Sequence, residues 1–262
     1  MRALLTAATG MMAQELNVQV ISNNIANMRT TGYKRQRVEF QDLLYEHVSR
    51  IGTQTSAQGN TLPVGIDLGG GVKTVGTPRL MTQGTLLLTG GSLVVAIRGD
   101  GFFKVQMPDG TYAYTRDGSL QMDAQGRIVT AQGNVIAPGI TIPQNSTGLT
   151  INPQGQVSVT PQGSTTPTVL GQLTLTRFIN QTGLLAIGDN LFTETPASGT
   201  PQDGLPATDG AGDLLQSSLE QANVEAVTEI SDLIAAQRAY EMNSKVISAA
   251  DQMLSATSNL MH

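Results

Sequence analysis

Both ends of the chain carry apolar residues at helical spacing. In the N-terminal segment, residues 1 to about 28, apolar side chains recur every seven positions, which predicts an amphipathic helix. The polar run 22–27 competes with the helical backbone for hydrogen bonds, and Gly32 follows soon after, so we expect the helix to end near here. The apolar positions that define this helix are Leu4, Met11, Val18 and Ile25.

The C-terminal segment, residues 223 to 260, has two apolar seams. The seams lie about 100° apart around a helix, so this helix has apolar surface for more than one partner. A hairpin between the two terminal helices would cover one seam and leave the other in water. The first seam repeats by sevens and comprises Leu233, Tyr240, Ile247, Leu254 and Met261. The second follows a heptad pattern with steps of four and three and comprises Ala235, Ala239, Met242, Val246, Ala249, Met253, Ala256 and Leu260.

The middle of the chain alternates short apolar–polar runs with turn signals. The runs 103–107, 112–115, 156–159 and 172–176 have the two-residue period of β-strands. Asp-Gly between such runs predicts tight hairpins, because glycine adopts the positive φ of these turns. We expect turns at Asp100-Gly101, Asp109-Gly110, Asp117-Gly118, Gln125-Gly126 and Gln132-Gly133.

These patterns predict an α+β fold, with N- and C-terminal helices paired as a coiled-coil-like terminal domain and an antiparallel β-rich domain inserted between them. The expected domains are 1–30 together with 223–262, a connecting region 31–71, and a β-rich outer domain 72–222. Two segments are expected to be loops: the glycine-rich stretch 50–71 and the proline-rich stretch 196–212.

Composition excludes several classes of function. A net charge of -5 and a pI near 5.0 argue against nucleic-acid binding, which needs a concentrated basic face. The chain has no cysteine and therefore no disulfide or thiolate metal site. No apolar run approaches the roughly 20 residues that span a bilayer, so no membrane insertion is expected. The N-terminus is a poor secretory signal, which predicts that any export signal is not cleaved.

Candidate catalytic and metal-binding residues are few. The two histidines, His47 and His262, lie far apart in sequence and lack a ligand cluster. Four aspartates occupy predicted turns, where Asp is favoured for bonding its own backbone rather than for acid–base chemistry. We therefore predict no catalytic residue, no metal and no cofactor. The aspartates are Asp100, Asp109, Asp117 and Asp123.

A basic group at residues 29–37 has two interpretations of equal weight. No acidic residue interrupts it before Glu39. It is either a solvated loop or a charged patch that faces an acidic partner or a neighbouring subunit. Its members are Arg29, Lys34, Arg35 and Arg37.

One stretch resembles the N-terminal signature of flagellar rod and hook proteins: Ser22-Asn23-Asn24-Ile25-Ala26-Asn27-Met28-Arg29-Thr30-Thr31-Gly32-Tyr33-Lys34. The family's signature reads Asn-Asn-Leu-Ala-Asn and, after a short gap, Thr-x-Gly-Phe-Lys. Ile25 replaces Leu and Tyr33 replaces Phe. Residues 96–103 with 114–119 resemble the family's β-domain signature, and 221–225 with 236–245 its C-terminal one. The family motif corresponds here to Asn23, Asn24, Ala26, Asn27, Thr30, Gly32, Tyr33 and Lys34.

Within the family, residues 35–45 and the following loop 50–71 are similar to distal-rod members. The resemblance implies a structural subunit that polymerises with copies of itself into a rigid hollow shaft and transmits torque across the periplasm. The implied partners are proximal-rod proteins, the hook protein, the ring bushing around the rod and the type III export apparatus. The implied interface is formed by the terminal helices, through Leu4, Met11, Val18, Ile25, Leu233, Tyr240, Met242, Val246, Ile247, Met253, Leu254 and Leu260.

Two alternatives remain at this point. A proximal-rod or hook subunit of the same family would differ in the loop 50–71, which the resemblance associates with a straight, stiff rod. An extracellular β-rich enzyme or carbohydrate-binding module would need a concave site with aromatic residues and paired carboxylates. This chain is only 4% aromatic, and most of its aromatic residues lie at alternating strand positions.

Overall fold

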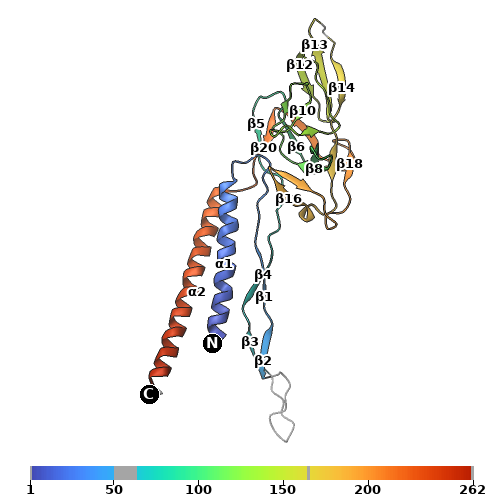
Figure 1. The fold of residues 1–262 in the computed structure, drawn as a ribbon. Helices are drawn as coiled ribbons and strands as arrows, with labels where there is room; N and C mark the ends of the chain where they lie inside the picture. Colours follow the sequence, from blue (N-terminus) through green and yellow to red (C-terminus); the bar gives the residue numbers. More distant parts are fainter. Residues whose placement is uncertain (1, 50–63, 164–165, 261–262) are drawn as a thin grey trace. The chain divides into compact units, whose positions relative to one another are not determined.

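The computed structural model describes residues 2–49, 64–163 and 166–260, and it confirms the α+β class (Figure 1). The chain forms two compact units. The helical unit comprises Met1–Ile25, Gln36–Pro78 and Glu225–His262, and the β unit comprises Ala26–Arg35 and Arg79–Val224. The division into three domains expected from the sequence stays a prediction. Neither described helix is long and apolar enough to cross a lipid bilayer.

The helical unit is built on two long antiparallel helices, α1 (Arg2–Ala26) and α2 (Ala226–Leu260), which lie side by side in Figure 1. Two contacts fix their direction. Asn24, near the end of α1, donates a hydrogen bond of 3.1 Å to Glu229 at the start of α2. Gly10 lies against Asn243 further along α2, so closely that a Cβ on Gly10 would be 2.9 Å from the Asn243 amide nitrogen. Small residues on the facing surfaces thus allow a close helix pair.

A two-stranded antiparallel ribbon belongs to the same unit. It consists of β1 (Glu39–Asp42) paired with β4 (Val72–Gly76), and β2 (Tyr45–Ser49) paired with β3 (Ile66–Gly69). The prediction of a loop over 50–71 is therefore wrong for 66–69, which pair as a strand. Residues 50–63 lie outside the described part of the chain. Residues 66–69 form a strand because the backbone of β2 pairs with them.

The ribbon rests on helix α1 at its glycines. The Leu43 amide donates to the Gly71 carbonyl at 2.8 Å and joins the two halves of the ribbon. Gly71 has φ +114°, and a side chain there would overlap Thr9 of α1. The Val72 amide donates to the Thr9 hydroxyl at 3.3 Å. These glycines thus permit close packing of the ribbon on the helix.

The β unit contains a nine-stranded antiparallel sheet, ordered β16-β17-β8-β7-β11-β10-β9, with β15 pairing both β7 and β18. A three-stranded sheet β12-β13-β14 and the pairs β19-β6 and β20-β5 complete it. The elements are β5 (Leu86–Leu88), β6 (Val95–Arg98), β7 (Phe102–Gln106), β8 (Tyr112–Thr115), β9 (Gln121–Met122), β10 (Ile128–Val129), β11 (Val135–Ile136), β12 (Ser146–Ile151), β13 (Gln156–Pro161), β14 (Thr168–Gln172), β15 (Leu175–Arg177), η1 (Gln181–Gly183), β16 (Leu185–Gly188), β17 (Leu191–Thr193), β18 (Gln202–Gly204), β19 (Asp213–Gln216) and β20 (Ser218–Glu220).

Three of the five predicted hairpin turns are confirmed. Asp109-Gly110 joins β7 to β8, Gln125-Gly126 joins β9 to β10, and Gln132-Gly133 joins β10 to β11. The hairpins predicted at Asp100-Gly101 and Asp117-Gly118 are wrong, because β6 pairs with β19 and β8 pairs with β7 and β17.

Gly118 has a different role from a hairpin turn. The Val95 amide donates to the Gly118 carbonyl at 3.0 Å, and a Cβ on Gly118 would collide with the Val95 carbonyl. Glycine is needed at this position because two backbone segments approach each other closely.

Two hydrophobic clusters lie in the β unit, and strand β7 contributes to both. Phe103 and Val105 belong to the larger cluster, whereas Phe102 packs edge-on against Phe178 in the smaller one. Burial on both faces of β7 explains why simple alternation does not describe its first residues. The larger cluster comprises Val95, Ile97, Phe103, Val105, Ala113, Leu120, Ile128, Ile136, Ile140, Ile142, Ile151, Val157, Val159, Leu173, Leu175, Leu191 and Leu214.

Two further predictions need correction. The run 172–176 is not one strand, because β14 ends at Gln172 and β15 begins at Leu175. Between them the buried Leu173 donates its amide to the Gly155 carbonyl at 2.8 Å. The expected loop 196–212 contains a short strand, Gln202–Gly204, which pairs with β15.

Candidate assembly surface and its buried motif

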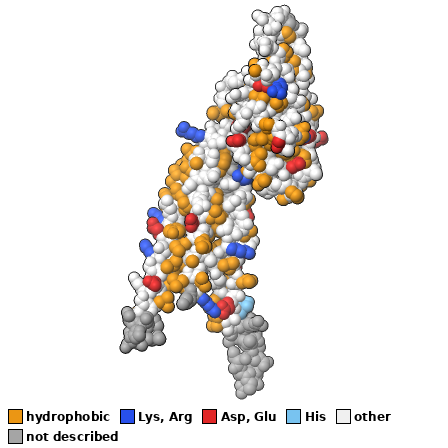
Figure 2. Space-filling view, viewed as in Figure 1, with side chains coloured by type: hydrophobic (Ala, Val, Ile, Leu, Met, Phe, Trp, Pro, Cys, Tyr) orange, Lys and Arg blue, Asp and Glu red, His pale blue; other side chains and the backbone are white. Residues whose placement is uncertain are grey.

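The second predicted seam of α2, with heptad spacing, is largely exposed to solvent. Met242, Val246 and Met253 expose 61%, 48% and 64% of their surface. Ala235, Ala249 and Ala256 are also exposed, whereas Ala239 is half-buried. Figure 2 shows hydrophobic side chains along the helices. Large exposed apolar residues at heptad spacing are typical of a surface that another helix covers. The side chain of Leu260 and the residue Met261 lie outside the described part.

The first seam of α2 is partly buried. Leu233 and Ile247 are half-buried, and Tyr240 and Leu254 are each 44% exposed. The buried positions of α2 among the described residues are ones that neither seam included: Glu229, Ala236 and Ala250. The first seam is thus only partly covered, and the large residues of the second seam are more exposed than those of the first.

The predicted seam of α1 is not its most buried face. Leu4, Met11, Val18 and Ile25 are all half-buried. Helix α1 is covered both by α2 and by the ribbon, so its burial does not follow a single seam. The fully buried apolar residues of α1 are Ala7, Ala13, Val20 and Ile21.

The ribbon carries an apolar surface that the sequence pattern did not reveal. Tyr45, Val48 and Ile66 are between 52% and 58% exposed, and Leu44 is 92% exposed. Apolar residues of β2 and β3 lie on both faces of the ribbon. The sequence pattern therefore does not predict that either face is buried. A two-stranded ribbon of this kind is marginally stable without further packing.

The family motif ties the end of α1 to the start of α2. The buried amide of Asn24 accepts from the Gln36 backbone N–H at 2.9 Å and donates to the Gln36 carbonyl at 2.9 Å. The same amide donates to the Glu229 carboxylate at 3.1 Å. An asparagine can make all three bonds because its side chain carries both a donor and an acceptor. One side chain therefore joins three segments of the helical unit.

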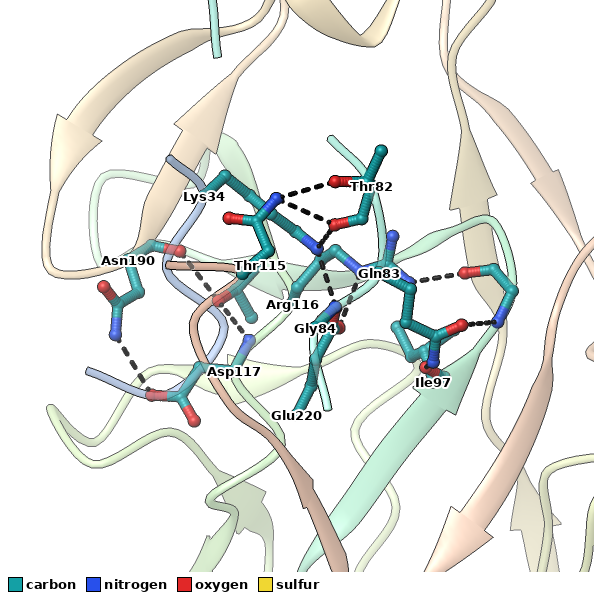
Figure 3. A network of polar contacts seen from close by, with 12 residues as sticks. Lys34, Thr82, Gln83, Gly84, Ile97, Thr115, Arg116, Asp117, Asn190 and Glu220 are labelled. Atoms are coloured by element: carbon teal, nitrogen blue, oxygen red, sulfur yellow. Dashed lines mark hydrogen bonds and ion pairs between the residues drawn. The ribbon is translucent and has the colours of Figure 1, made fainter. Parts of the chain in front are cut away.

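Lys34, the last residue of the motif, is completely buried in the β unit (Figure 3). Its ammonium donates to Glu220 at 2.7 Å and to the Thr82 carbonyl at 2.8 Å. Arg116, also buried, places its Nε 3.1 Å from the other Glu220 oxygen. The Gly84 amide donates to Glu220 as well, at 2.9 Å. One carboxylate thus serves two buried cations.

Burial lowers the pKa of Lys34 from its usual 10.5, and the neighbouring positive charge of Arg116 lowers it further. The attraction of Glu220 acts in the opposite direction. A buried charge without a counter-charge lowers the stability of the fold. The two buried cations, Lys34 and Arg116, therefore depend on the carboxylate of Glu220.

The basic group 29–37 is not a single surface patch. Lys34 is buried, and Arg37 is exposed and pairs with Glu39 at 2.8 Å. Arg35 is half-buried, and its backbone amide donates to Asn223 at 2.7 Å. Both interpretations are therefore wrong for Lys34, whose side chain points inward. Spacing of basic residues in sequence does not reveal which of them meets a buried acid.

Gly32 of the motif is required by backbone geometry. It has φ +67°, and a Cβ would lie 2.9 Å from the carbonyl carbon of Arg116. Its amide donates to the backbone carbonyl of Glu220 at 2.8 Å. The motif thus passes directly over Glu220, which binds Lys34, and over Arg116, which pairs with the same carboxylate.

The remaining motif residues shape the turn after α1. Thr30 donates its hydroxyl to the Asn27 side chain at 3.1 Å. Ala26 is the last residue of α1, and Asn23 is exposed. Tyr33 is half-buried and lines a pocket of about 270 Å³ together with Asn27, Lys34 and Arg79.

The described residues contain no cluster of metal-ligating side chains. No group of three or more His, Cys, Asp or Glu side chains there could hold a metal ion. His47 lies on the exposed ribbon, 2.6 Å from Asp67, and His262 is outside the described part. As predicted, three turn aspartates bond their own backbone: Asp109 accepts from Thr111, Asp117 from Ser119, and Asp123 from Gln125.

Three family models match separate parts of the chain. The flagellar basal body rod protein model matches residues 4–34, the flagellar hook protein FlgE/F/G D1 domain model matches 96–159, and the flagellar basal body rod FlgEFG protein C-terminal model matches 215–260. They cover α1 with its motif, the centre of the β unit, and β20 with α2.

Full-length relatives agree with these matches. The flagellar basal-body rod protein FlgG of Caulobacter vibrioides is 55% identical over 99% of both chains. FlgG of Bacillus subtilis is 34% identical, again over 99% of both chains. The flagellar basal-body rod protein FlgF of Caulobacter vibrioides is 34% identical over 94% of this chain and 91% of its own. With this identity and coverage, the chain belongs to the flagellar basal-body rod protein family.

Proposed function

We propose that this rod protein is a non-enzymatic structural subunit of the flagellar distal rod, which polymerises through its terminal helices into a rigid hollow shaft. The observation that carries the proposal is the exposure of large apolar residues at heptad spacing on α2. Greater identity to FlgG than to FlgF within one organism, 55% against 34%, supports the distal rather than the proximal rod.

The exposed seam supplies a driving force for polymerisation. Fully burying a Met or Val side chain contributes roughly 1.5–3 kcal/mol. Met242 and Val246 lie one helical turn apart and are both about half exposed or more. A contact between this seam and a different surface of the next copy is heterologous, and such contacts build an open helix when the rotation does not close.

The proposed assembly begins with export. The subunit leaves the cytoplasm unfolded through the type III export apparatus, without a cleaved signal, and folds as it joins the growing shaft. The absence of cysteine is compatible with this route, since no disulfide can form before or during passage. The proposed neighbours are further copies of the chain, proximal-rod proteins, the hook protein and the ring bushing through which the shaft transmits torque.

The test is complementation of a strain that lacks this gene, read by electron microscopy of basal bodies. The deletion strain should have rods that stop after the proximal part and carry no hook. Complete rods that lack only the hook would indicate a hook subunit, and intact flagella would refute the proposal.

The role of the seam is tested in the same strain with Met242→Glu and Val246→Glu together. This variant should fail to complete the rod, because it buries charge in the proposed contact. The matched control, Gln237→Glu with Ser244→Glu, adds the same charge at exposed polar positions of α2 and should restore hooks. If the seam variant also restores hooks, the seam is not the polymerisation surface.

A further inference from the structure

A pocket of about 270 Å³ lies in the β unit between the family motif and the β16–β17 hairpin. At about 30 Å³ for each water molecule, this volume corresponds to roughly nine waters, so the pocket has room for a small ligand or for a side chain. The proposed function assigns no role to it. Its lining includes Asn27, Tyr33, Arg79, Asp189, Leu191 and Phe192.

The walls of the pocket are held together by the tip of the hairpin. Asn190 donates its side-chain amide to the Thr31 carbonyl of the motif at 3.1 Å and to the Asp117 carboxylate at 3.4 Å (Figure 3). Its backbone carbonyl accepts a hydrogen bond from the Thr115 hydroxyl at 2.8 Å. Phe192, two residues further on, is buried. The pocket is therefore preformed within the β unit, as binding sites for small ligands usually are.

Arg79 brings a positive charge to this pocket without a matching acid. Its side chain is half-buried, and its guanidinium lies over the Phe192 ring, 5.8 Å from the ring centroid. Among the residues that the structure describes, no carboxylate pairs with this guanidinium. The buried Arg116 differs in this respect, since it pairs with Glu220.

The charge of Arg79 is unfavourably placed without an anion. Burial lowers the pKa of Arg79 below its usual value, because the loss of water disfavours the charged form, while the neighbouring Tyr33 acts in the opposite direction. An arginine nevertheless keeps its charge in a protein. The fold thus carries a half-buried cation, and the attraction of the Phe192 ring offsets only part of its desolvation.

We propose that this pocket binds a carboxylate group through Arg79. The planar guanidinium offers parallel N–H donors that match the two oxygens of a carboxylate. Asp189, which lines the same pocket and is exposed, repels negative charge and so favours a singly charged group over a phosphate dianion. Leu191 and Phe192 provide an apolar wall for a short carbon stem. Both a small organic acid and an acidic side chain of a second copy of this chain carry such a group.

The test is a titration of the purified full-length protein with propionate, a short monocarboxylate. Binding is followed by nuclear magnetic resonance through the backbone amide signals of Tyr33 and Phe192, which every variant retains. Propionamide, the neutral analogue of similar shape, is the control ligand. Arg79→Gln removes the guanidinium, and Arg238→Gln removes the same charge from an exposed position of α2 as the matched control.

Propionate should shift the two signals until they saturate, and propionamide should not. Arg79→Gln should weaken binding by at least about tenfold, because it removes charge-assisted hydrogen bonds, and Arg238→Gln should leave binding unchanged. Arg79→Lys should weaken it less than Arg79→Gln, since it keeps the charge but loses the fork. Absence of saturation with propionate, or equal binding by wild type and Arg79→Gln, would overturn the proposal.

A variant with a gain of affinity guards against effects of misfolding. Asp189→Asn removes a repelling charge from the pocket and should tighten the binding of propionate. A destabilised protein would bind more weakly, so a tighter complex cannot result from unfolding. Weaker binding by Asp189→Asn at an unchanged unfolding temperature would contradict an anion site.

The source of the carboxylate is decided by complementation of the deletion strain with Arg79→Gln and Arg238→Gln. If Arg79→Gln alone loses hooks while its monomer unfolds at the wild-type temperature, the carboxylate that fills the pocket belongs to a neighbouring copy. Wild-type numbers of hooks in both strains assign the pocket to a free organic acid. The titration uses the monomer and does not depend on the proposed function, whose failure is seen separately as intact flagella in the deletion strain.

Discussion

Lys34 and Glu220 lie 186 residues apart in sequence and form an ion pair of 2.7 Å in which both side chains are fully buried. Lys34 lies in the segment between α1 and β1, and Glu220 ends β20, the last strand before α2. The pair therefore joins the incoming and outgoing segments of the β unit. Its partner Arg116 comes from the segment after β8, so the cluster also anchors the large sheet.

Removing the acid of this cluster should destabilise the protein more than removing the lysine. Glu220→Gln leaves two buried cations without a counter-charge, and we expect a loss of about 3–5 kcal/mol. Lys34→Met leaves the Glu220–Arg116 pair and should cost less. Urea unfolding of the purified monomer measures both. Arg37→Ala, which removes an exposed ion pair, is the control and should change stability by less than about 1 kcal/mol. Equal losses for Glu220→Gln and Lys34→Met would contradict this order.

Gly32→Ala should be more harmful than the same change at a glycine with similar backbone but free space. Gly32 and Gly133 have φ of +67° and +88°, yet only Gly32 has atoms within 4 Å of an added Cβ. The positive φ alone costs roughly 1–2 kcal/mol, which Gly133→Ala measures. The backbone of Arg116 cannot move aside cheaply, so Gly32→Ala should show a larger loss in thermal unfolding. If Gly32→Ala costs no more stability than Gly133→Ala, the backbone of Arg116 moves aside at little cost.

Acid should remove a part of the stability that depends on Asp213. Hydrogen bonds and the charge of Arg98 lower the pKa of Asp213 below its usual 3.8. The unfolded chain then binds the proton more readily, so this contribution is present above pH 3.8 and is lost as the pH falls through the lowered pKa. Asp213→Asn should flatten the dependence of unfolding free energy on pH below 3.8. Urea unfolding at several acid pH values tests this, and an unchanged slope would refute it.

Deletion of residues 50–65 should soften the polymer without preventing folding. Most of this segment lies outside the described residues, but it connects β2 and β3, whose exposed residues Tyr45, Val48 and Ile66 are available to neighbouring subunits. We expect isolated rods of the variant to bend more in electron micrographs. The monomer should keep the far-ultraviolet circular dichroism of the wild type. Equal bending of variant and wild-type rods would contradict the prediction.

The sequence by itself determined the features that depend on local periodicity. The heptad of α2 placed Met242 and Val246 on one face, and the two-residue period placed Phe103 and Val105 in a core. Three Gly-containing turns, and the hydrogen bonds from nearby backbone amides to the carboxylates of Asp109 and Asp123, followed from the chemistry of a few adjacent residues. Helix turn and strand pleat are set within a few positions, so a linear pattern suffices to predict them.

Only the tertiary structure decided which distant segments meet. It buried Lys34 against Glu220, brought Gly118 against Val95, paired β2 with β3, and joined Asn24 of α1 to Glu229 of α2. Each of these results depends on a partner far away in sequence, and neither side carries a local mark of the other. A buried ion pair and a close backbone contact become favourable only when the rest of the fold excludes water and fixes the two segments together, and that requirement cannot be read from either segment alone.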